Sequence, residues 1–261
     1  MQVIQPDWPA PPRVRAFSTT RDGGVSSGVF SSLNLGDHVG DEPVRVARNR
    51  ALLRERLSLP GEPLWLRQVH GCNLVPSQAG ASPASSSGPC EADGAVTSDP
   101  ESVCAVMTAD CLPVLMCDRQ GTRVAAVHAG WRGLAAGILE EAFQALGICA
   151  KRVLVWLGPA IGPQAFEVGP EVRARFVEFD PRAAEAFRLR PDGRWLADLA
   201  ELARQRFARL GVRDVYGGVY CTFSDPRRFF SYRRDGVTGR MASLIWLSRD
   251  DDAAWGDASH A

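Results

Sequence analysis

The sequence contains a single lysine, Lys151, although 30 of its 261 residues are basic. Acidic residues also number 30, so the formal net charge is zero and no overall field favours nucleic acid or an anionic membrane. No apolar run approaches the roughly 20 residues that cross a bilayer. Residues 1–12 lack the basic and apolar segments of a signal peptide. We therefore expect a cytoplasmic protein without nucleic-acid or membrane partners, present as a monomer or a homodimer.

Histidine is scarce and the cysteines are not paired in sequence. The chain has four histidines and seven cysteines, and no CxxC spacing occurs. An odd, unpaired set of cysteines is typical of reduced thiols in a cytoplasm. A buried cysteine in that setting is free to serve as a core residue, a nucleophile or a metal ligand.

The apolar patterns predict an α+β domain with mixed β-sheets. Strands are predicted at 13–18, 64–69, 102–108, 112–117, 123–128, 152–157, 212–220 and 241–247. Helices are predicted from Pro43 to residue 57, at 134–146 and at 197–210. Residues 77–89, rich in Ser, Ala, Gly and Pro, are interpreted as a mobile loop, and 250–261 as a flexible tail. Residues 1–249 are thus expected to form one catalytic domain.

Three side chains stand where a predicted strand gives way to a turn. His70 and His128 each end a strand before a glycine-bearing turn, and Cys111 lies between two apolar strands. Such positions can direct a side chain into a pocket while the backbone stays fixed. Two imidazoles and a thiolate suit Zn²⁺, and three protein ligands leave one position open, as in catalytic zinc sites.

The same residues allow two other interpretations. All three could be satisfied core residues, because no short metal motif such as HExxH is present. Alternatively, Cys111 could be the thiolate nucleophile of a cysteine hydrolase, with His128 as its base.

Seven segments, taken together, resemble one family over nearly the whole chain. These segments are residues 18–26, 32–36, 68–71 (QVHG), 108–113 (TADCLP), 128–133 (HAGWRG), 157–163 (LGPAIGP) and 230–241. The chain resembles the bacterial laccase-domain family, also called multicopper polyphenol oxidases. Members of that family have since been described as purine nucleoside phosphorylases with adenosine deaminase activity.

The resemblance implies a metal, a reaction and an architecture. It implies zinc bound by His70, Cys111 and His128, with copper as an alternative metal, in a four-layer α/β/β/α fold. It also implies phosphorolysis of adenosine, inosine or guanosine, with adenosine deaminase and methylthioadenosine phosphorylase activity. Copper-dependent polyphenol oxidation and editing of cell-wall precursors remain alternatives, although four histidines are too few for a cluster of several coppers.

Six further residues are candidates for parts of such a site. Arg132 and the surrounding backbone amides could bind phosphate, as could Arg21 on the first glycine turn. Asn34 could orient a ribose hydroxyl or simply close its own turn. Asp110 could support a histidine or act as an acid or base, although strand alternation would turn it away from Cys111 unless the strand breaks there. At least one arginine of the aromatic C-terminal stretch is expected to face a pocket; these candidates are Arg233 and Arg234.

Overall fold

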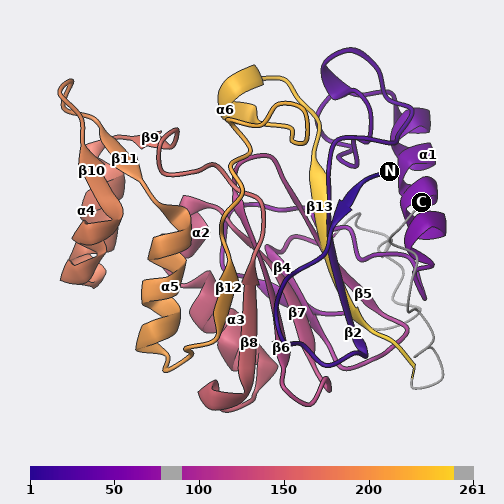
Figure 1. Ribbon diagram of the computed structural model, residues 1–261, viewed down its shortest axis with the longest axis horizontal. Helices are drawn as coiled ribbons and strands as arrows, with labels where there is room; N and C mark the ends of the chain where they lie inside the picture. Colours follow the sequence, from indigo (N-terminus) through magenta and orange to yellow (C-terminus); the bar gives the residue numbers. More distant parts are fainter. Residues whose placement is uncertain (78–89, 250–261) are drawn as a thin grey trace.

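The structure, a computed structural model, describes residues 1–77 and 90–249. The predicted tail 250–261 and most of the predicted loop, 78–89, lie outside these residues. Figure 1 shows α1 on one side, two β-sheets in the middle, and α2, α3 and α5 on the other side. This is the predicted α+β architecture with its four layers.

The helices and strands occupy the following residues. The helices are α1 Pro43–Leu57, α2 Trp131–Ala136, α3 Ile138–Leu146, α4 Pro170–Phe179, α5 Leu199–Arg209 and α6 Tyr232–Asp235, with short 3₁₀ turns at Gly28–Phe30, Ala150–Arg152 and Pro181–Ala186. The strands are β1 Val3–Ile4, β2 Val14–Thr19, β3 Leu74–Pro76, β4 Gly94–Thr97, β5 Val103–Thr108, β6 Leu112–Asp118, β7 Val124–Ala129, β8 Val153–Leu157, β9 Glu167–Val168, β10 Phe187–Leu189, β11 Trp195–Ala197, β12 Val215–Gly217 and β13 Met241–Leu247.

Two sheets form the middle layers, and a third, small one lies outside them. The four-stranded sheet, in the order β1-β2-β13-β5, is antiparallel throughout. The six-stranded sheet, in the order β12-β8-β6-β7-β4-β3, is mixed, because β12 and β3 at its two edges run parallel to their neighbours. Strands β9, β10 and β11 form a small antiparallel sheet beside α4, on the arm at one end of Figure 1.

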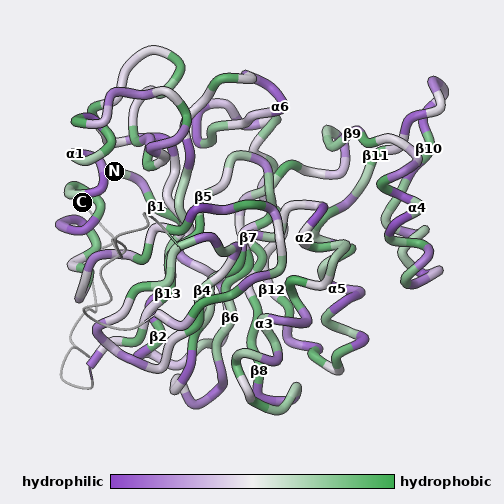
Figure 2. The backbone as a smooth tube through the Cα atoms, turned by 180° about the vertical axis from the view of Figure 1, so that it is seen from behind, coloured by the Kyte–Doolittle hydropathy of each residue, from purple (hydrophilic) through white to green (hydrophobic). Residues whose placement is uncertain are grey.

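The central strands β6, β7 and β8 are almost entirely apolar, and both of their faces are buried. On β6, Leu112 and Val114 pack toward the helical layer, whereas Leu115 and Cys117 pack toward the four-stranded sheet. Strands β7 and β8 alternate in the same way. On the far side, Leu53 of α1 packs with the outer face of β5 and β13. Figure 2 shows the hydrophobic segments gathered in these central strands.

Three predicted elements differ from the structure. Residues 64–69 are not a strand but an extended segment with isolated bridges at Leu64 and Arg67. The predicted helix 134–146 is two helices, because Gly137 adopts a positive φ of 106° between α2 and α3. The predicted strand 212–220 shortens to β12. Apolar content alone does not supply the backbone pairing that defines a strand.

A buried carboxylate closes the turn at the far end of β6. Asp118, with no exposed surface, accepts hydrogen bonds from the backbone N–H of Thr122 at 2.6 Å and of Arg123 at 3.3 Å, and forms an ion pair with Arg152 at 2.9 Å.

Within the described residues, no helix has the length and apolarity to span a membrane.

Candidate metal centre

The three predicted ligands converge at one end of the stacked sheets. The ligand atoms of His70, Cys111 and His128 all lie within 4.8 Å of one another. Cys111 Sγ lies 3.8 Å from His70 Nε2, and the two imidazole rings meet edge to face with centroids 4.8 Å apart. His70 is exposed, Cys111 is partly buried and His128 is buried. The cluster therefore opens toward solvent on the His70 side.

Each ligand is positioned by a different local feature. His128 lies on β7, whose pairing with β6 and β4 fixes its place. Cys111 follows Asp110, a turn residue with a φ of 95°, so the alternation of β5 is broken and Cys111 can face the cluster. His70 has a φ of 60°, in the left-handed region, and follows a segment that Gln68 pins to β5. The side-chain amide of Gln68 donates a hydrogen bond of 2.8 Å to the Met107 carbonyl and accepts one of 2.7 Å from the Met107 N–H. It thus replaces the pair of backbone hydrogen bonds that a neighbouring strand would form.

The spacing and chemistry of these donors fit a single zinc ion. Zn–N bonds of about 2.0–2.1 Å and Zn–S bonds of about 2.3 Å in a tetrahedron place ligand atoms roughly 3.3–3.7 Å apart. With ligand atoms no more than 4.8 Å apart, the separations would have to shorten by at most about 1.5 Å. Within residues 1–77 and 90–249, these three residues form the one His/Cys/Asp/Glu group close enough to hold a metal ion.

Gly130 leaves the space in which the three ligands meet. A Cβ atom built on Gly130 would lie 2.9 Å from His70 Cδ2, 3.2 Å from Cys111 Sγ and 3.6 Å from His128 Cε1. The φ of Gly130 is −64°, a conformation open to any residue. Glycine is thus required here for room and not for backbone freedom.

Charge and hydrogen bonding favour a thiolate beside an imidazolium in this cluster. Burial alone would raise the pKa of Cys111, but the charge of His128 and hydrogen bonds from both histidines lower that pKa to about 6. Burial would likewise lower the pKa of His128, but Cys111 and Asp93 raise it to about 9. The Cys111 sulfur is therefore in the form that binds metals, and a metal ion would displace the Nε2 proton of His128, while Nδ1 keeps the proton that it donates to Asp93.

Asp93 is a site residue that the sequence patterns did not predict. Its carboxylate has no exposed surface and accepts a hydrogen bond of 2.8 Å from His128 Nδ1. Burial would raise the pKa of Asp93, but hydrogen bonds from His128 and from the amides of Gly71 and His70 outweigh it and lower the pKa. The sequence signal for Asp93 is slight: an acid between Ala92 and Gly94, directly before an apolar strand.

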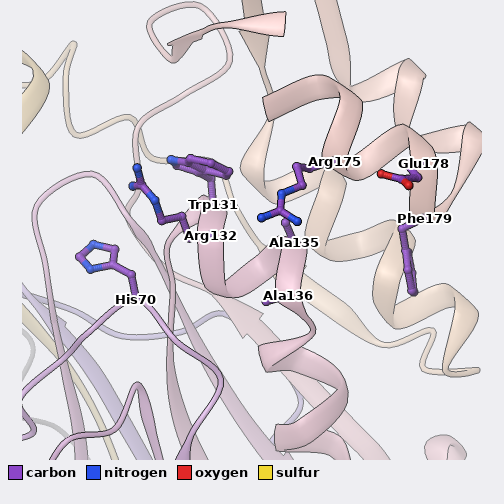
Figure 3. Close-up of a pocket in the computed structure, with 8 residues that line it drawn as sticks. All are labelled: His70, Trp131, Arg132, Ala135, Ala136, Arg175, Glu178 and Phe179. Carbon is purple, nitrogen blue, oxygen red and sulfur yellow. The ribbon is translucent and has the colours of Figure 1, made fainter. Parts of the chain in front are cut away.

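A pocket of about 570 Å³ begins at His70 and extends between α2 and α4. Figure 3 shows His70, Trp131 and Arg132 at one end, and Arg175, Glu178 and Phe179 of α4 at the other. The guanidinium of Arg132 lies 4.6 Å from the centre of a Trp131 ring. Within the described residues it has no ion-pair or hydrogen-bond partner.

Buried Arg206 of α5 ties the two walls of this pocket together. It donates hydrogen bonds of 2.7 Å to Glu140 and 2.9 Å to the carbonyl of Ala135 on α2, and its guanidinium lies 4.3 Å from the ring centre of Phe179 on α4. The α4 wall, including Arg175, has no counterpart among the predicted elements.

The structure places the other predicted substrate residues in internal networks. Arg21 donates to the carbonyls of Ser31 and Pro226, and Asn34 closes its own turn through Gly36 and accepts from the amide of Arg240.

The two adjacent C-terminal arginines are held in the same way. Arg234 donates to the carbonyls of Thr222, Phe223 and Phe229, and Arg233 donates to that of Glu167. Of the five predicted substrate residues, Arg132 lines the pocket.

Asp110 and Arg240 are joined to these networks, Asp110 through Arg233 and Thr222 and Arg240 through Asn34. The carboxylate of Asp110 accepts a hydrogen bond of 2.6 Å from the Thr222 hydroxyl and one of 2.7 Å from the Arg233 amide. Burial lowers the pKa of Arg240, and the negative charges of Cys111 and Asp110 oppose that shift. Arg240 is therefore a cation close enough to interact with the charge of Cys111. The sequence analysis did not select it among the arginines of the C-terminal stretch.

Fold and site together define a four-layer α+β protein with a solvent-accessible His–Cys–His centre at the mouth of a pocket. A family model described as multi-copper polyphenol oxidoreductase laccase matches residues 15–248. The chain belongs to this family.

Its relatives cover nearly all of it. It is 55% identical to a purine nucleoside phosphorylase of Pseudomonas aeruginosa, over 94% of this chain and 98% of that protein. It is 52% identical to the purine nucleoside phosphorylase YfiH of Escherichia coli, over 94% and 99% of the two chains. A crystal structure of a Neisseria meningitidis protein matches with a TM-score of 0.89 at 49% identity, covering 95% of this chain and 100% of that one.

We predict that Gly130→Ala disrupts metal binding without unfolding the protein, because the new methyl group would occupy the place where the ligands meet. Zinc affinity, measured by competition with a chromophoric chelator, should fall by about 10-fold or more. Gly71→Ala is the matched control: its Cβ would meet Asp93 and Val69 at an ordinary 3.6 Å, and zinc affinity should be retained. Equal zinc affinity in both variants would contradict the assigned geometry.

Proposed function

We propose that the chain is a zinc-dependent purine nucleoside phosphorylase whose zinc is bound by His70, Cys111 and His128. The observation that carries the proposal is the convergence of these ligand atoms within 4.8 Å at the mouth of a pocket. The names of its relatives in Pseudomonas aeruginosa and Escherichia coli supply the reaction. The substrates would be adenosine, inosine or guanosine with phosphate, and the products a free base and ribose 1-phosphate.

The pocket suits a nucleoside in size and in the character of its walls. At about 570 Å³ it lies in the range of small-molecule sites, and its walls combine aromatic, small apolar and charged side chains. We assign phosphate binding to Arg132, because it lines the same pocket as His70 and its guanidinium has no hydrogen-bond or ion-pair partner in the described part of the chain. Arg21, Asn34, Arg233 and Arg234 would act indirectly, by holding the loops around the site.

The residues of the chain orient the site, and a bound zinc ion would supply Lewis-acid chemistry and a water activated at neutral pH. Asp110 would hold Cys111 in place, since its carboxylate already binds Thr222 and Arg233. Because His70 is exposed and lines the pocket, a substrate in the pocket would reach the cluster from this side. Deamination of adenosine and phosphorolysis of methylthioadenosine belong to the same proposal as further activities of this site.

We place the protein in the cytoplasm, where its nucleosides would be found.

A second candidate function rests on one specific observation. Cys111, His128 and Asp93 form a chain of interactions in which the thiol is acidic and the imidazole is held by a carboxylate. This is the arrangement of a cysteine nucleophile with its base. A cysteine hydrolase would use these residues without metal.

Product analysis with a nucleoside panel tests the main proposal. We expect zinc-loaded protein to release free base from inosine, guanosine and adenosine only when phosphate is present, with ribose 1-phosphate formed in equal amount. Cys111→Ala should keep its circular dichroism spectrum but lose both metal and turnover. Unchanged turnover in that variant, or zinc-loaded wild type inactive on every nucleoside, would contradict the proposal.

Arg132→Ala should weaken the use of phosphate more than that of the nucleoside. Loss of a hydrogen bond to a charged group costs about 1.5–3 kcal/mol, so the KM for phosphate should rise roughly 10-fold or more. Arg227→Ala, which removes an exposed arginine outside the pocket, is the control. A KM for phosphate that stays the same in Arg132→Ala would remove Arg132 from the phosphate site.

Thiol alkylation separates the two candidate functions. In metal-free protein at pH 7, a pKa of about 6 makes roughly nine-tenths of Cys111 thiolate. Cys111 should therefore react with iodoacetamide before Cys72, whose pKa is raised by burial, and its rate should fall as the pH drops below 6. One equivalent of zinc should protect Cys111. Hydrolytic turnover that persists in chelated protein and disappears on alkylation would favour the cysteine hydrolase.

A further inference from the structure

Asp93 connects two of the three ligands, although they come from separate segments of the chain. It directly precedes β4, where the pairing of β4 with β7 sets it beside His128. The backbone N–H of His128 donates a hydrogen bond of 2.7 Å to the Asp93 carbonyl, and the Asp93 N–H donates one of 2.9 Å to Asn73. These two backbone hydrogen bonds alone fix the position of Asp93 at the edge of β4.

The carboxylate of Asp93 accepts four hydrogen bonds, and all four come from the metal-binding region. Oδ1 accepts from the His70 amide at 2.9 Å and from His128 Nδ1 at 2.8 Å. Oδ2 accepts from the Gly71 amide at 2.6 Å and the Val69 amide at 3.2 Å. One side chain thus binds the ring of one ligand and the backbone of another.

Each of these contacts has a consequence for metal binding. A carboxylate accepts but does not donate, so Nδ1 of His128 keeps its proton, and Nε2 is the nitrogen that can lose a proton and bind the metal. Three successive amides, 69–71, converge on the same carboxylate, and this concave arrangement needs the left-handed backbone of His70. A non-glycine residue in that conformation is strained by about 1 kcal/mol or more, so it needs such an anchor.

We propose that Asp93 is the positioning residue of the metal centre: it sets the tautomer of His128 and the backbone of His70, and so preorganises both imidazoles before the ion binds. Cys111 is held independently, through Asp110. The proposal rests on the metal site of the proposed function, but it concerns ion affinity and not the reaction.

Asp93→Asn is the sharpest variant because it keeps the size of the side chain and removes its chemistry. If the amide oxygen faces His128, the NH₂ group meets the amides of Gly71 and Val69, donor against donor. If the NH₂ group faces His128, the ring must carry its proton on Nε2 and can no longer bind the metal through that atom. Both orientations disturb a ligand.

Asp118→Asn is the matched control. Asp118 is also fully buried and also accepts backbone amides, but it lies at the other end of β6 from the cluster. Both variants should lower the midpoint of thermal unfolding. Only Asp93→Asn should change how the protein binds zinc.

Zinc competition and amide exchange provide the test. For Asp93→Asn we expect zinc affinity to fall about 10- to 100-fold and exchange of the amides of Val69, His70 and Gly71 to accelerate in metal-free protein, with neither change in Asp118→Asn. Zinc affinity within twofold of wild type in Asp93→Asn would overturn the proposal. Tight zinc binding by a wild type that converts no nucleoside would instead refute the proposed function and leave this inference intact.

A measurement on the wild type keeps the proposal testable if Asp93→Asn does not fold. Long-range nitrogen–proton NMR spectra of zinc-loaded protein should show the His128 proton on Nδ1 and the metal on Nε2. A proton on Nε2, or metal on Nδ1, would overturn the proposal.

Discussion

Burial of both faces of the six-stranded sheet is the constraint on which the rest of the molecule depends. With one face against the helices and the other against the second sheet, a one-residue slip of β6 or β7 would exchange the two sets of buried side chains. The register is therefore fixed, and with it the neighbours at the ends of the strands. The pairing of β4 with β7 places His128 beside Asp93, and the same register fixes where β6 begins, directly after Cys111.

The candidate metal centre joins this rigid framework to a less regular segment. His128 is part of a strand, whereas His70 lies on an extended segment that is held by side chains, by Gln68 on one side and Asp93 on the other. The strand β7 fixes buried His128, and the side chains of Gln68 and Asp93 hold the segment of exposed His70. The two histidines can therefore lie side by side although one is buried and the other exposed. The donor set, two imidazoles and one thiolate, suits one borderline ion better than a cluster of coppers, despite the historical description of the family.

The pocket has walls of different origin. α2 follows directly from β7 and so is tied to the ligand strand, while α4 and the small sheet β9–β11 form an arm outside the four layers. Arg206 joins these walls through Ala135 and Phe179. The arm contributes Arg175, Glu178 and Phe179 of α4 to the end of the pocket opposite His70.

The amino-acid sequence by itself determined the apolar strands, the long helices α1 and α5, the α+β class and the three candidate ligands, because periodicity and donor chemistry are local properties. The pairing that residues 64–69 lack and the placement of α4 against the pocket depended on partners distant in the chain, whereas the helix break at Gly137 is local and was missed because glycine also occurs inside helices. Asp93 and Gly130 acquired their parts only in the folded molecule, one through hydrogen bonds across strands and the other through the space it leaves. The sequence could indicate which side chains are candidate metal ligands. Only tertiary packing decides which carboxylate contacts them and where the space between them lies, because those contacts join distant segments.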